Sequence, residues 1–307
     1  MASSLILDAT SSGARAGLFA GCIATPGFFA HTRRGSPAHL TPDNASKSLA
    51  ATAAYHASLS DLLMPATSSF TNAGGARPFL NLGAHPLFLA QRDAVSNQPV
   101  TGGDHQCTVA TQKGNVALTP ASFVRFHDAV RPDFVQLLSD EVTHEATNNR
   151  CRKSSERTLA WSNECLRLLR EHAAAAASAS EPAVASSSSP SPSHASKVFF
   201  TVQGGGSLQS RAWLAQQVAS KPVDGFVIGG LGLGEPAALR RALIDAVVAH
   251  LPADKPRFLP GCSAPDRVLD SVARGVDLFD GAFPALATDS QAREPDGGRA
   301  IVALAMQ

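Results

Sequence analysis

The sequence has few cysteines and almost no charge imbalance, and both features exclude classes of protein. Its five cysteines are spread over 307 residues, and no two of them form a Cys-x-x-Cys pair. An odd number of dispersed cysteines argues against a disulfide framework and against a thiolate zinc site, so we expect reduced thiols. The formal net charge is +1, so the chain lacks the overall basic character of a nucleic-acid binder, although a local basic patch remains compatible with it.

Long apolar runs are missing as well. No stretch approaches the ~18 apolar residues that a membrane-spanning helix needs. The first eight residues have neither the charged start nor the long apolar region of a signal peptide. With reduced cysteines, these absences predict a cytoplasmic protein. The ten histidines are dispersed, and we expect no metal site built from this chain.

The sequence does contain a regular alternation of short apolar segments and amphipathic helices between residues 225 and 284. The apolar segments each end in a glycine-rich or acidic turn, and we predict them to be strands at residues 226–228, 256–259 and 276–279. The helices are predicted at residues 235–251, where leucines and a valine recur on one face, and at residues 265–274. This alternation predicts an α/β fold in which helices wrap a parallel sheet.

An acidic residue, Asp280, stands just past the last of these predicted strands. In barrels of parallel strands, the active site forms at the C-terminal strand ends. Asp280 is therefore a candidate nucleophile or base. The alternative is an exposed turn acid that caps the next segment.

Three motifs in this region resemble the tRNA-guanine transglycosylase family. They are Gly-Phe-Val-Ile-Gly-Gly-Leu followed by Gly-Glu-Pro at residues 225–236, Leu-Pro-Ala-Asp-Lys-Pro-Arg at 251–257, and Arg-Gly-Val-Asp-Leu-Phe-Asp at 274–280. The resemblance implies a (β/α)8 TIM-type barrel that exchanges a base in tRNA. In such enzymes a carboxylate attacks C1′ of a flipped guanosine, guanine leaves, and an incoming base displaces the carboxylate. By its position in the motif, Asp280 is the nucleophile.

The same resemblance implies a pocket for the base. Residues 132–140 match a family segment in which a strand, predicted here at 134–138, leads to an aspartate that hydrogen-bonds the purine. Asp140 takes that position, with a strand-end acid in solvent as the alternative. The other residues expected to line the base pocket are Gln203, after a predicted strand at 198–202, with Gly230 and Leu231.

The general acid/base of active family members is missing near residue 80. Those members carry Asp-Ser-Gly-Gly-Phe-Gln, and the corresponding stretch is residues 78–88, where Asn81 stands near the aspartate position. An amide does not accept a proton usefully near neutral pH, so base catalysis would be lost. Residues 66–110 as a whole show little periodicity, and we predict loops with one or two short strands.

Residues 132–140 and 165–168 resemble most closely a non-catalytic accessory branch of the family, whose members are partners of an active subunit. The resemblance therefore implies an accessory subunit of a queuine tRNA-ribosyltransferase, in a heterodimer with the catalytic subunit that exchanges guanine for queuine at the tRNA wobble position. It also implies an association with the mitochondrial outer surface as an alternative location. The retained Asp280 leaves open an active transglycosylase, and a third hypothesis is a barrel that binds queuine or another nucleobase alone. Four basic residues either contact phosphates or form a solvated helix face: Arg150, Arg152, Lys153 and Arg157.

Two segments depart from the family pattern. Residues 173–196 are almost entirely Ala, Ser, Pro and Glu, and we predict a low-complexity loop inserted in a single barrel domain of residues 1–307. After Pro284 the family's Cys-x-Cys-x-x-Cys…His zinc motif is absent, so we expect no zinc or other cofactor on this chain. We therefore expect a barrel truncated at its C-terminus, with one last strand at 301–304 and an exposed edge where the barrel fails to close.

At the N-terminal end of the sequence, residues 13–44 are predicted to form a hairpin and loop, with Thr41 capping a helix from Pro42.

Overall fold

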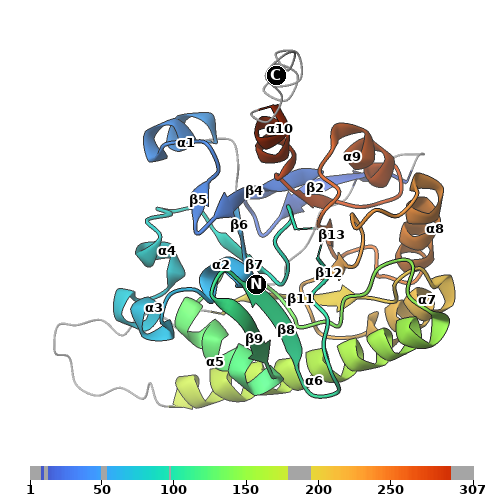
Figure 1. Cartoon of the computed structure of the whole chain (residues 1–307), viewed down its shortest axis with the longest axis horizontal. Helices are drawn as coiled ribbons and strands as arrows, with labels where there is room; N and C mark the ends of the chain where they lie inside the picture. The colour runs from blue at the N-terminus through green and yellow to red at the C-terminus, as the bar shows by residue number, and fades with distance from the viewer. Residues whose placement is uncertain (1–7, 10–12, 50–53, 97, 179–194, 292–307) are drawn as a thin grey trace.

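The computed structural model describes residues 8–9, 13–49, 54–96, 98–178 and 195–291, and these fold around a closed barrel of eight parallel strands (Figure 1). In order around the barrel, the strands are β4 (Gly27–Arg33), β6 (Tyr55–Ser58), β7 (Leu87–Ala90), β10 (Phe134–Gln136), β11 (Lys197–Val202), β12 (Gly225–Ile228), β13 (Arg257–Leu259) and β14 (Leu278–Asp280). The expected (β/α)8-type fold is confirmed. The prediction of an exposed edge was wrong, because β14 pairs with β4 and closes the barrel, with Asp280 opposite Phe29.

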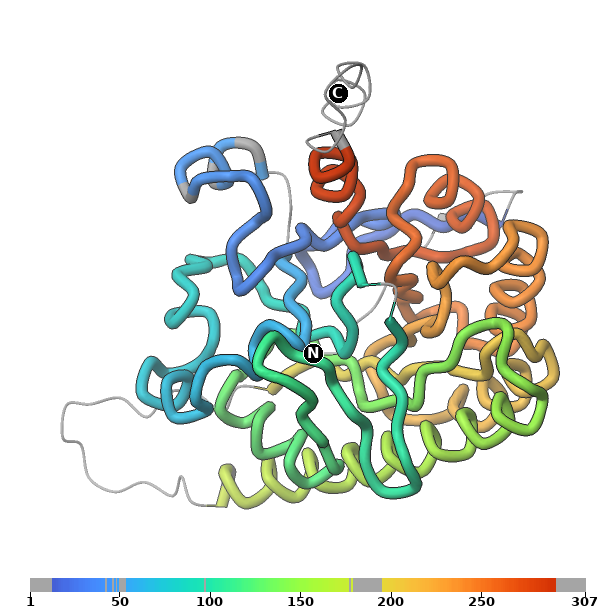
Figure 2. The backbone as a smooth tube through the Cα atoms, viewed as in Figure 1, coloured from blue at the N-terminus to red at the C-terminus, as the bar shows by residue number. Residues whose placement is uncertain are grey.

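Helices cover the outside of the barrel and connect its strands. Those of the described ranges are α1 (Pro42–Ser48), α2 (Leu59–Leu62), α3 (Thr67–Ala73), α4 (Ala76–Phe79), α5 (Pro120–Val130), α6 (Asn148–Ser178), α7 (Leu208–Val218), α8 (Ala237–Val248), α9 (Pro265–Val272) and α10 (Phe283–Gln291). The smaller strands are β1 (Asp8–Ala9), β2 (Arg15–Phe19), β3 (Ile23–Thr25), β5 (Ser36–Pro37), β8 (Cys107–Thr111) and β9 (Gly114–Leu118). The long helix α6 begins beside α7 and ends beside α5 (Figure 2). None of the helices described is long and apolar enough to cross a membrane.

Phenylalanines fill the inside of the barrel. Successive side chains of a strand point to opposite faces. The inward positions carry large aromatic rings that are at most 3% exposed, namely Phe29, Phe88, Phe134, Phe199 and Phe258. Neighbouring ring centroids lie between 4.8 and 6.4 Å apart, which is the favourable range for aromatic pairs. The interior is therefore a packed core, and chemistry has room only at the ends of the barrel.

The hairpin of β2 and β3 closes the N-terminal end of the barrel. The ring of Phe19 lies 5.2 Å from that of Phe134 and 5.6 Å from that of Phe199. Arg15, on the same hairpin, donates from Nε to Oδ1 of the buried Asp277 at 3.0 Å. The predicted opening hairpin is thus confirmed, and so is the helix cap, since Thr41 Oγ1 accepts from the Asn44 amide at 3.4 Å. This end of the barrel is built for stability.

The alternation predicted between residues 225 and 284 is confirmed as β12, α8, β13, α9 and β14 in that order. Helix α8 begins at Ala237, directly after Pro236. The acid before it, Glu235, accepts hydrogen bonds from the amides of Gly232 and Leu233 at 3.0 Å each. Glu235 therefore closes the glycine-rich turn that leads from β12 into the helix.

Residues 66–110 contain more regular structure than predicted, because α3, α4 and β7 lie there. Phe70 of α3 is fully buried, and its ring centroid lies 6.1 Å from that of Phe126 in α5. Packing against α5 thus stabilises short helices that local periodicity does not indicate.

The loop predicted at residues 173–196 begins later than expected. Helix α6 continues to Ser178, because the alanines that follow residue 172 have the highest helix propensity of any residue type. Residues 179–194 and the last strand predicted at 301–304 lie outside the described residues.

Candidate functional site

Polar residues gather where the barrel strands end. Asp280 is the last residue of β14, and the other positions come shortly after their strands, with Gln91 after β7, Asp140 after β10, Gln203 after β11, and Gly230 and Leu231 after β12. All of them are buried, Asp140 at 0% and Asp280 at 1% exposure. The structure therefore brings the predicted nucleophile and the predicted base-pocket residues to the same end of the barrel.

The carboxylate of Asp280 is held by two turns of the backbone. Its Oδ2 accepts from the amide of Gly261, after β13, at 2.6 Å, and its Oδ1 accepts from the amide of Ala282 at 3.1 Å. The two donors come from the turns that follow β13 and β14, and each binds one oxygen of the carboxylate. Asp280 lies at the C-terminal end of a barrel strand, and its role as a nucleophile stays a prediction.

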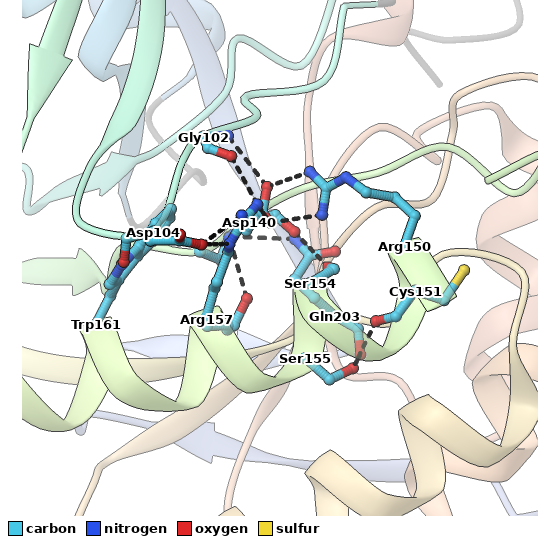
Figure 3. Close-up of polar contacts among 12 residues, drawn as sticks. Gly102, Asp104, Asp140, Arg150, Cys151, Ser154, Ser155, Arg157, Trp161 and Gln203 are labelled. Carbon is cyan, nitrogen blue, oxygen red and sulfur yellow. Dashed lines mark hydrogen bonds and ion pairs between the residues drawn. The ribbon is translucent and has the colours of Figure 1, made fainter. Parts of the chain in front are cut away.

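Asp140 is surrounded by cationic donors (Figure 3). Arg150 binds it in a bidentate manner, from Nη1 to Oδ2 at 2.6 Å and from Nη2 to Oδ1 at 2.7 Å. Arg157 Nη1 donates to Oδ2 at 3.3 Å, and the amide of Gly102 donates to Oδ1 at 3.1 Å. A carboxylate accepts about four hydrogen bonds, so this one has no free position for the N–H groups of a base.

A row of hydroxyl groups on α6 holds the backbone after β10. Thr158 Oγ1 accepts from the Asp140 amide at 3.0 Å, Ser154 Oγ donates to the Asp140 carbonyl at 2.5 Å, and Ser162 Oγ donates to the Leu138 carbonyl at 3.0 Å. The three residues are fully buried and stand four apart, so they share one face of the helix. This role was not predicted from the sequence, although the spacing of four was a visible signal.

Gln203 and Gln91 meet at Ser139. The Gln91 side chain donates to the Ser139 carbonyl and accepts from the Ser139 amide, both at 2.7 Å, and Gln203 Nε2 donates to Ser139 Oγ at 3.1 Å. The buried Gln203 Oε1 has no hydrogen-bond partner among the described residues. A Cβ at Gly230, whose φ is +68°, would lie 2.6 Å from this oxygen, so glycine is required there. The structure thus leaves one acceptor unused beside Gly230.

Glu141, the residue after Asp140, links three segments at the C-terminal end of the barrel strands, which we call the mouth of the barrel. Its carboxylate accepts from Arg92 Nε at 3.2 Å, from the amide of Val100 at 3.1 Å and from the amide of Gly230 at 3.1 Å. Arg92 also donates to the carbonyl of Leu231 at 2.9 Å. The backbone of the predicted base pocket is therefore held by an ion pair that the sequence analysis did not identify, since Arg92 lies in the region without clear periodicity.

Asn81 does not belong to this end of the barrel. It is exposed, has a φ of +54°, and lies in the turn that precedes β7, so it is at the opposite, N-terminal end. The residue directly after β7 is Gln91, an amide as well. The expectation that Asn81 stands near the position of the family's aspartate was therefore wrong, because Asn81 and the residues after β7 lie at opposite ends of that strand. Two residues beyond Gln91 stands Asp93, which does reach the mouth.

Two buried histidines occupy neighbouring strands on the other side of the mouth. His31 of β4 and His56 of β6 stand in register, and their ring centroids lie 6.0 Å apart. None of their four ring nitrogens has a hydrogen-bond partner among the described residues, and His31 Nε2 lies 3.6 Å from Asp93 Oδ1. Burial, with the neighbouring charges of His31 and Arg92, lowers the pKa of His56 to about 3. His56 is therefore neutral near pH 7, and the pair can offer N–H donors and nitrogen acceptors.

The described part of the chain contains no group of three or more His, Cys, Asp or Glu side chains placed to hold a metal ion. Burial raises the pKa of the Cys107 and Cys262 thiols to about 12, so neither is a ready thiolate ligand.

Comparison with known proteins gives one consistent result. A family model described as queuine tRNA-ribosyltransferase matches residues 10–297. The chain is 34% identical over 296 residues to queuine tRNA-ribosyltransferase accessory subunit 2 of Xenopus tropicalis, an alignment that covers 93% of this chain and 67% of that protein. It is 32% identical over 282 residues to the Homo sapiens protein of the same name, covering 86% of this chain and 60% of that protein.

A bacterial protein is similar as well. The queuine tRNA-ribosyltransferase of Stenotrophomonas maltophilia (strain R551-3) is 28% identical over 273 residues, which cover 86% of this chain and 66% of that protein. The chain thus spans about two thirds of the length of the relatives that it matches.

Proposed function

The chain belongs to the queuine tRNA-ribosyltransferase, or tRNA-guanine transglycosylase, family, and from this premise we propose that it is a non-catalytic accessory subunit. In this proposal it forms a heterodimer with a catalytic subunit. That heterodimer exchanges guanine for queuine at the wobble position of tRNA. We propose a cytoplasmic location, with association to the mitochondrial outer surface as the alternative, and no zinc bound by the described residues.

The main support for this proposal is the set of hydrogen bonds that the Asp140 carboxylate already accepts. An active member would use this aspartate to accept hydrogen bonds from the purine. Here its oxygens already accept from Arg150, Arg157 and Gly102. A base would have to displace charge-assisted hydrogen bonds, which are about twice as strong as neutral ones. The absence of a carboxylate directly after β7 points the same way, because no general base stands there.

Asp280 favours a second candidate, an active transglycosylase. Its carboxylate stands at the strand end and would attack C1′ of the target nucleoside, with guanine as the leaving group and the incoming base as the group that later displaces the carboxylate. Asp93 or His31 would then carry out the proton transfers, and His31 Nε2 lies 3.6 Å from Asp93 Oδ1. The unused Gln203 Oε1 is an acceptor that a base-binding barrel acting alone would also use.

Incorporation of labelled queuine into tRNA tests the proposal. The rate is measured for this chain alone, for the catalytic subunit alone and for the two mixed. An accessory subunit is active only in the mixture, and Asp280→Asn in this chain leaves the rate within about twofold.

Incorporation by this chain alone would overturn the proposal. In that case Asp280→Asn should reduce the rate by about 10⁴-fold or more, the effect of removing a nucleophile, and Asp93→Asn and His31→Gln would identify the base. Titration of queuine onto the chain alone, in the absence of tRNA, tests the third hypothesis, which requires saturable binding.

A further inference from the structure

A polar pocket of about 540 Å³ lies between the first turns of α6 and α7. Both helices follow barrel strands, β10 and β11, so their N-terminal ends lie at the same end of the barrel as Asp140 and Gln203. The lining of this pocket includes none of the residues of the predicted base pocket. We name it the α6–α7 pocket, defined by Asn148, Asn149, Arg152, Glu156, Gln209 and Trp213.

Trp213 is the unusual member of this pocket. Its exposed fraction is 37%, whereas the other tryptophan of the chain, Trp161, is 4% exposed and donates from Nε1 to the Asp104 carbonyl at 3.1 Å. A partly exposed indole among amide side chains provides a flat apolar face with hydrogen-bonding groups around it. Stacking on an aromatic face and amide hydrogen bonds to base edges are how proteins bind unstacked nucleobases.

The basic residues at the start of α6 divide into two groups. Arg150 and Arg157 turn inward and bind Asp140, so they are not available to phosphates (Figure 3). Arg152 instead lines the α6–α7 pocket and is 58% exposed. Its Nη1 lies 2.6 Å from Glu156 Oε1, and its Nη2 donates to Asn149 Oδ1 at 3.0 Å.

These contacts place the guanidinium at the edge of the pocket. Glu156 offsets the charge of Arg152, so the pocket is not a general anion site. A ligand that fits both features has a neutral planar part and a single phosphate beside it. A nucleotide is such a ligand, and the positive N-terminal ends of two helices add a favourable field for its phosphate.

We propose that the α6–α7 pocket binds one unstacked nucleotide of single-stranded RNA. The base stacks on Trp213, Asn148 and Gln209 hydrogen-bond its edge, and Arg152 contacts the adjacent phosphate. The identification of that RNA as a tRNA loop rests on the proposed function. The binding of a nucleotide rests on the pocket alone.

Tryptophan fluorescence measures this binding directly. The Trp161→Phe variant of the full chain has Trp213 as its one tryptophan. Titration with a single-stranded RNA of about seven nucleotides, with a tRNA anticodon stem-loop, with duplex RNA and with guanosine or uridine monophosphate distinguishes a loop nucleotide from a free nucleotide. We expect saturable quenching by the single strand and the stem-loop, none by the duplex, and weaker quenching by the monophosphates. Equal or tighter binding of a monophosphate would overturn the RNA assignment, and the absence of quenching by any RNA would overturn the site.

Matched variants locate the contact. Arg152→Ala should weaken RNA binding and lower the slope of log K against log salt by about one phosphate contact. Arg167→Ala is the control, because Arg167 lies on the same helix, is similarly exposed at 52%, and also pairs with glutamates. Equal effects of the two variants would overturn the assignment of Arg152.

The role of the indole is tested in the mixture with the catalytic subunit. Trp213→Ala should raise KM for tRNA about five- to hundredfold, the range for loss of one stacked base, with KM for queuine unchanged, and Trp213→Phe should restore part of the loss. Failure of the accessory function would appear as no incorporation above that of the catalytic subunit alone, while quenching of Trp213 by RNA would still be observed. Incorporation with no dependence on Trp213 and no quenching would instead overturn the pocket and leave the accessory function standing.

Discussion

The mouth of the barrel has two sides that differ in the groups that bind their carboxylates. On the β10 side, carboxylates meet guanidinium groups in a network made by Asp140, Glu141, Arg92, Arg150 and Arg157. On the β14 side, Asp280 meets two backbone amides, and His31 and His56 keep four ring nitrogens without hydrogen-bond partners among the described residues.

This difference separates two uses of a strand-end acid. The carboxylate of Asp140 holds a helix and a loop in place, and its acceptor positions are occupied. On the β14 side, the ring nitrogens of His31 and His56 still have hydrogen-bonding capacity that no described residue uses. An aspartate at the end of a barrel strand therefore does not by itself indicate a role in chemistry, and its partners decide.

Removing the central acid of the β10 side should have the largest effect. Asp140→Ala leaves Arg150 without its counter-charge, leaves Arg157 with only the exposed Asp104, and leaves the Gly102 amide without its acceptor. We expect a loss of about 3 kcal/mol in the free energy of unfolding, as for other broken buried ion pairs. Urea denaturation followed by circular dichroism measures it.

Asp104→Ala is the matched control for this prediction. Asp104 binds the same Arg157, at 2.6 Å, but its side chain is 78% exposed. We expect almost no change in the urea midpoint. If both variants shift the midpoint equally, the network of the β10 side does not contribute to stability as described.

Acid should destabilise the protein through the β14 side. The pKa of His56 is lowered to about 3 in the folded state by burial, His31 and Arg92, against about 6.5 in an unfolded chain. Below pH ~6.5 the unfolded state therefore binds a proton that the folded state does not. Stability falls as the pH decreases toward 3, by up to ~1.4 kcal/mol per pH unit.

Urea midpoints at pH 7 and pH 4.5 measure this loss, which should reach roughly 2.5 kcal/mol for His56. The His56→Leu variant should lose less stability over the same interval, whereas His105→Leu, at an exposed position, should behave as the unchanged protein does. An unchanged pH dependence in His56→Leu would show that His56 is not buried in neutral form.

A smaller effect is expected at Asp280. In Asp280→Asn, one of the two backbone amides that bind the side chain faces an NH₂ group in place of an oxygen. Loss of one buried hydrogen bond costs about 1–2 kcal/mol, which is less than the loss expected at Asp140. Thermal or urea denaturation compares the two variants, and a larger loss at Asp280 would reverse the order of the two sides.

Much of the fold was predictable because its signals are local. The strand lengths, the glycine turns after β12 and the helix cap at Thr41 follow from residues that are neighbours in the chain. Helices α3 and α4 were not predictable in this way, since the burial of Phe70 against Phe126 stabilises them and those residues are far apart in sequence. Closure of the barrel likewise depends on β14 meeting β4.

The candidate site divides along the same line. The sequence by itself determined that Asp280, Asp140 and Gln203 follow barrel strands, because an apolar run that ends in a polar or glycine turn marks a strand end wherever the strand packs. Only the tertiary structure decided what surrounds them. Arg150 reaches Asp140 because α6 folds back over the end of β10, and Arg92 reaches Glu141 across 49 residues of sequence. Hydrogen bonds and ion pairs act between atoms that are close in space, and the periodicity of a sequence carries no information about which distant residues will meet.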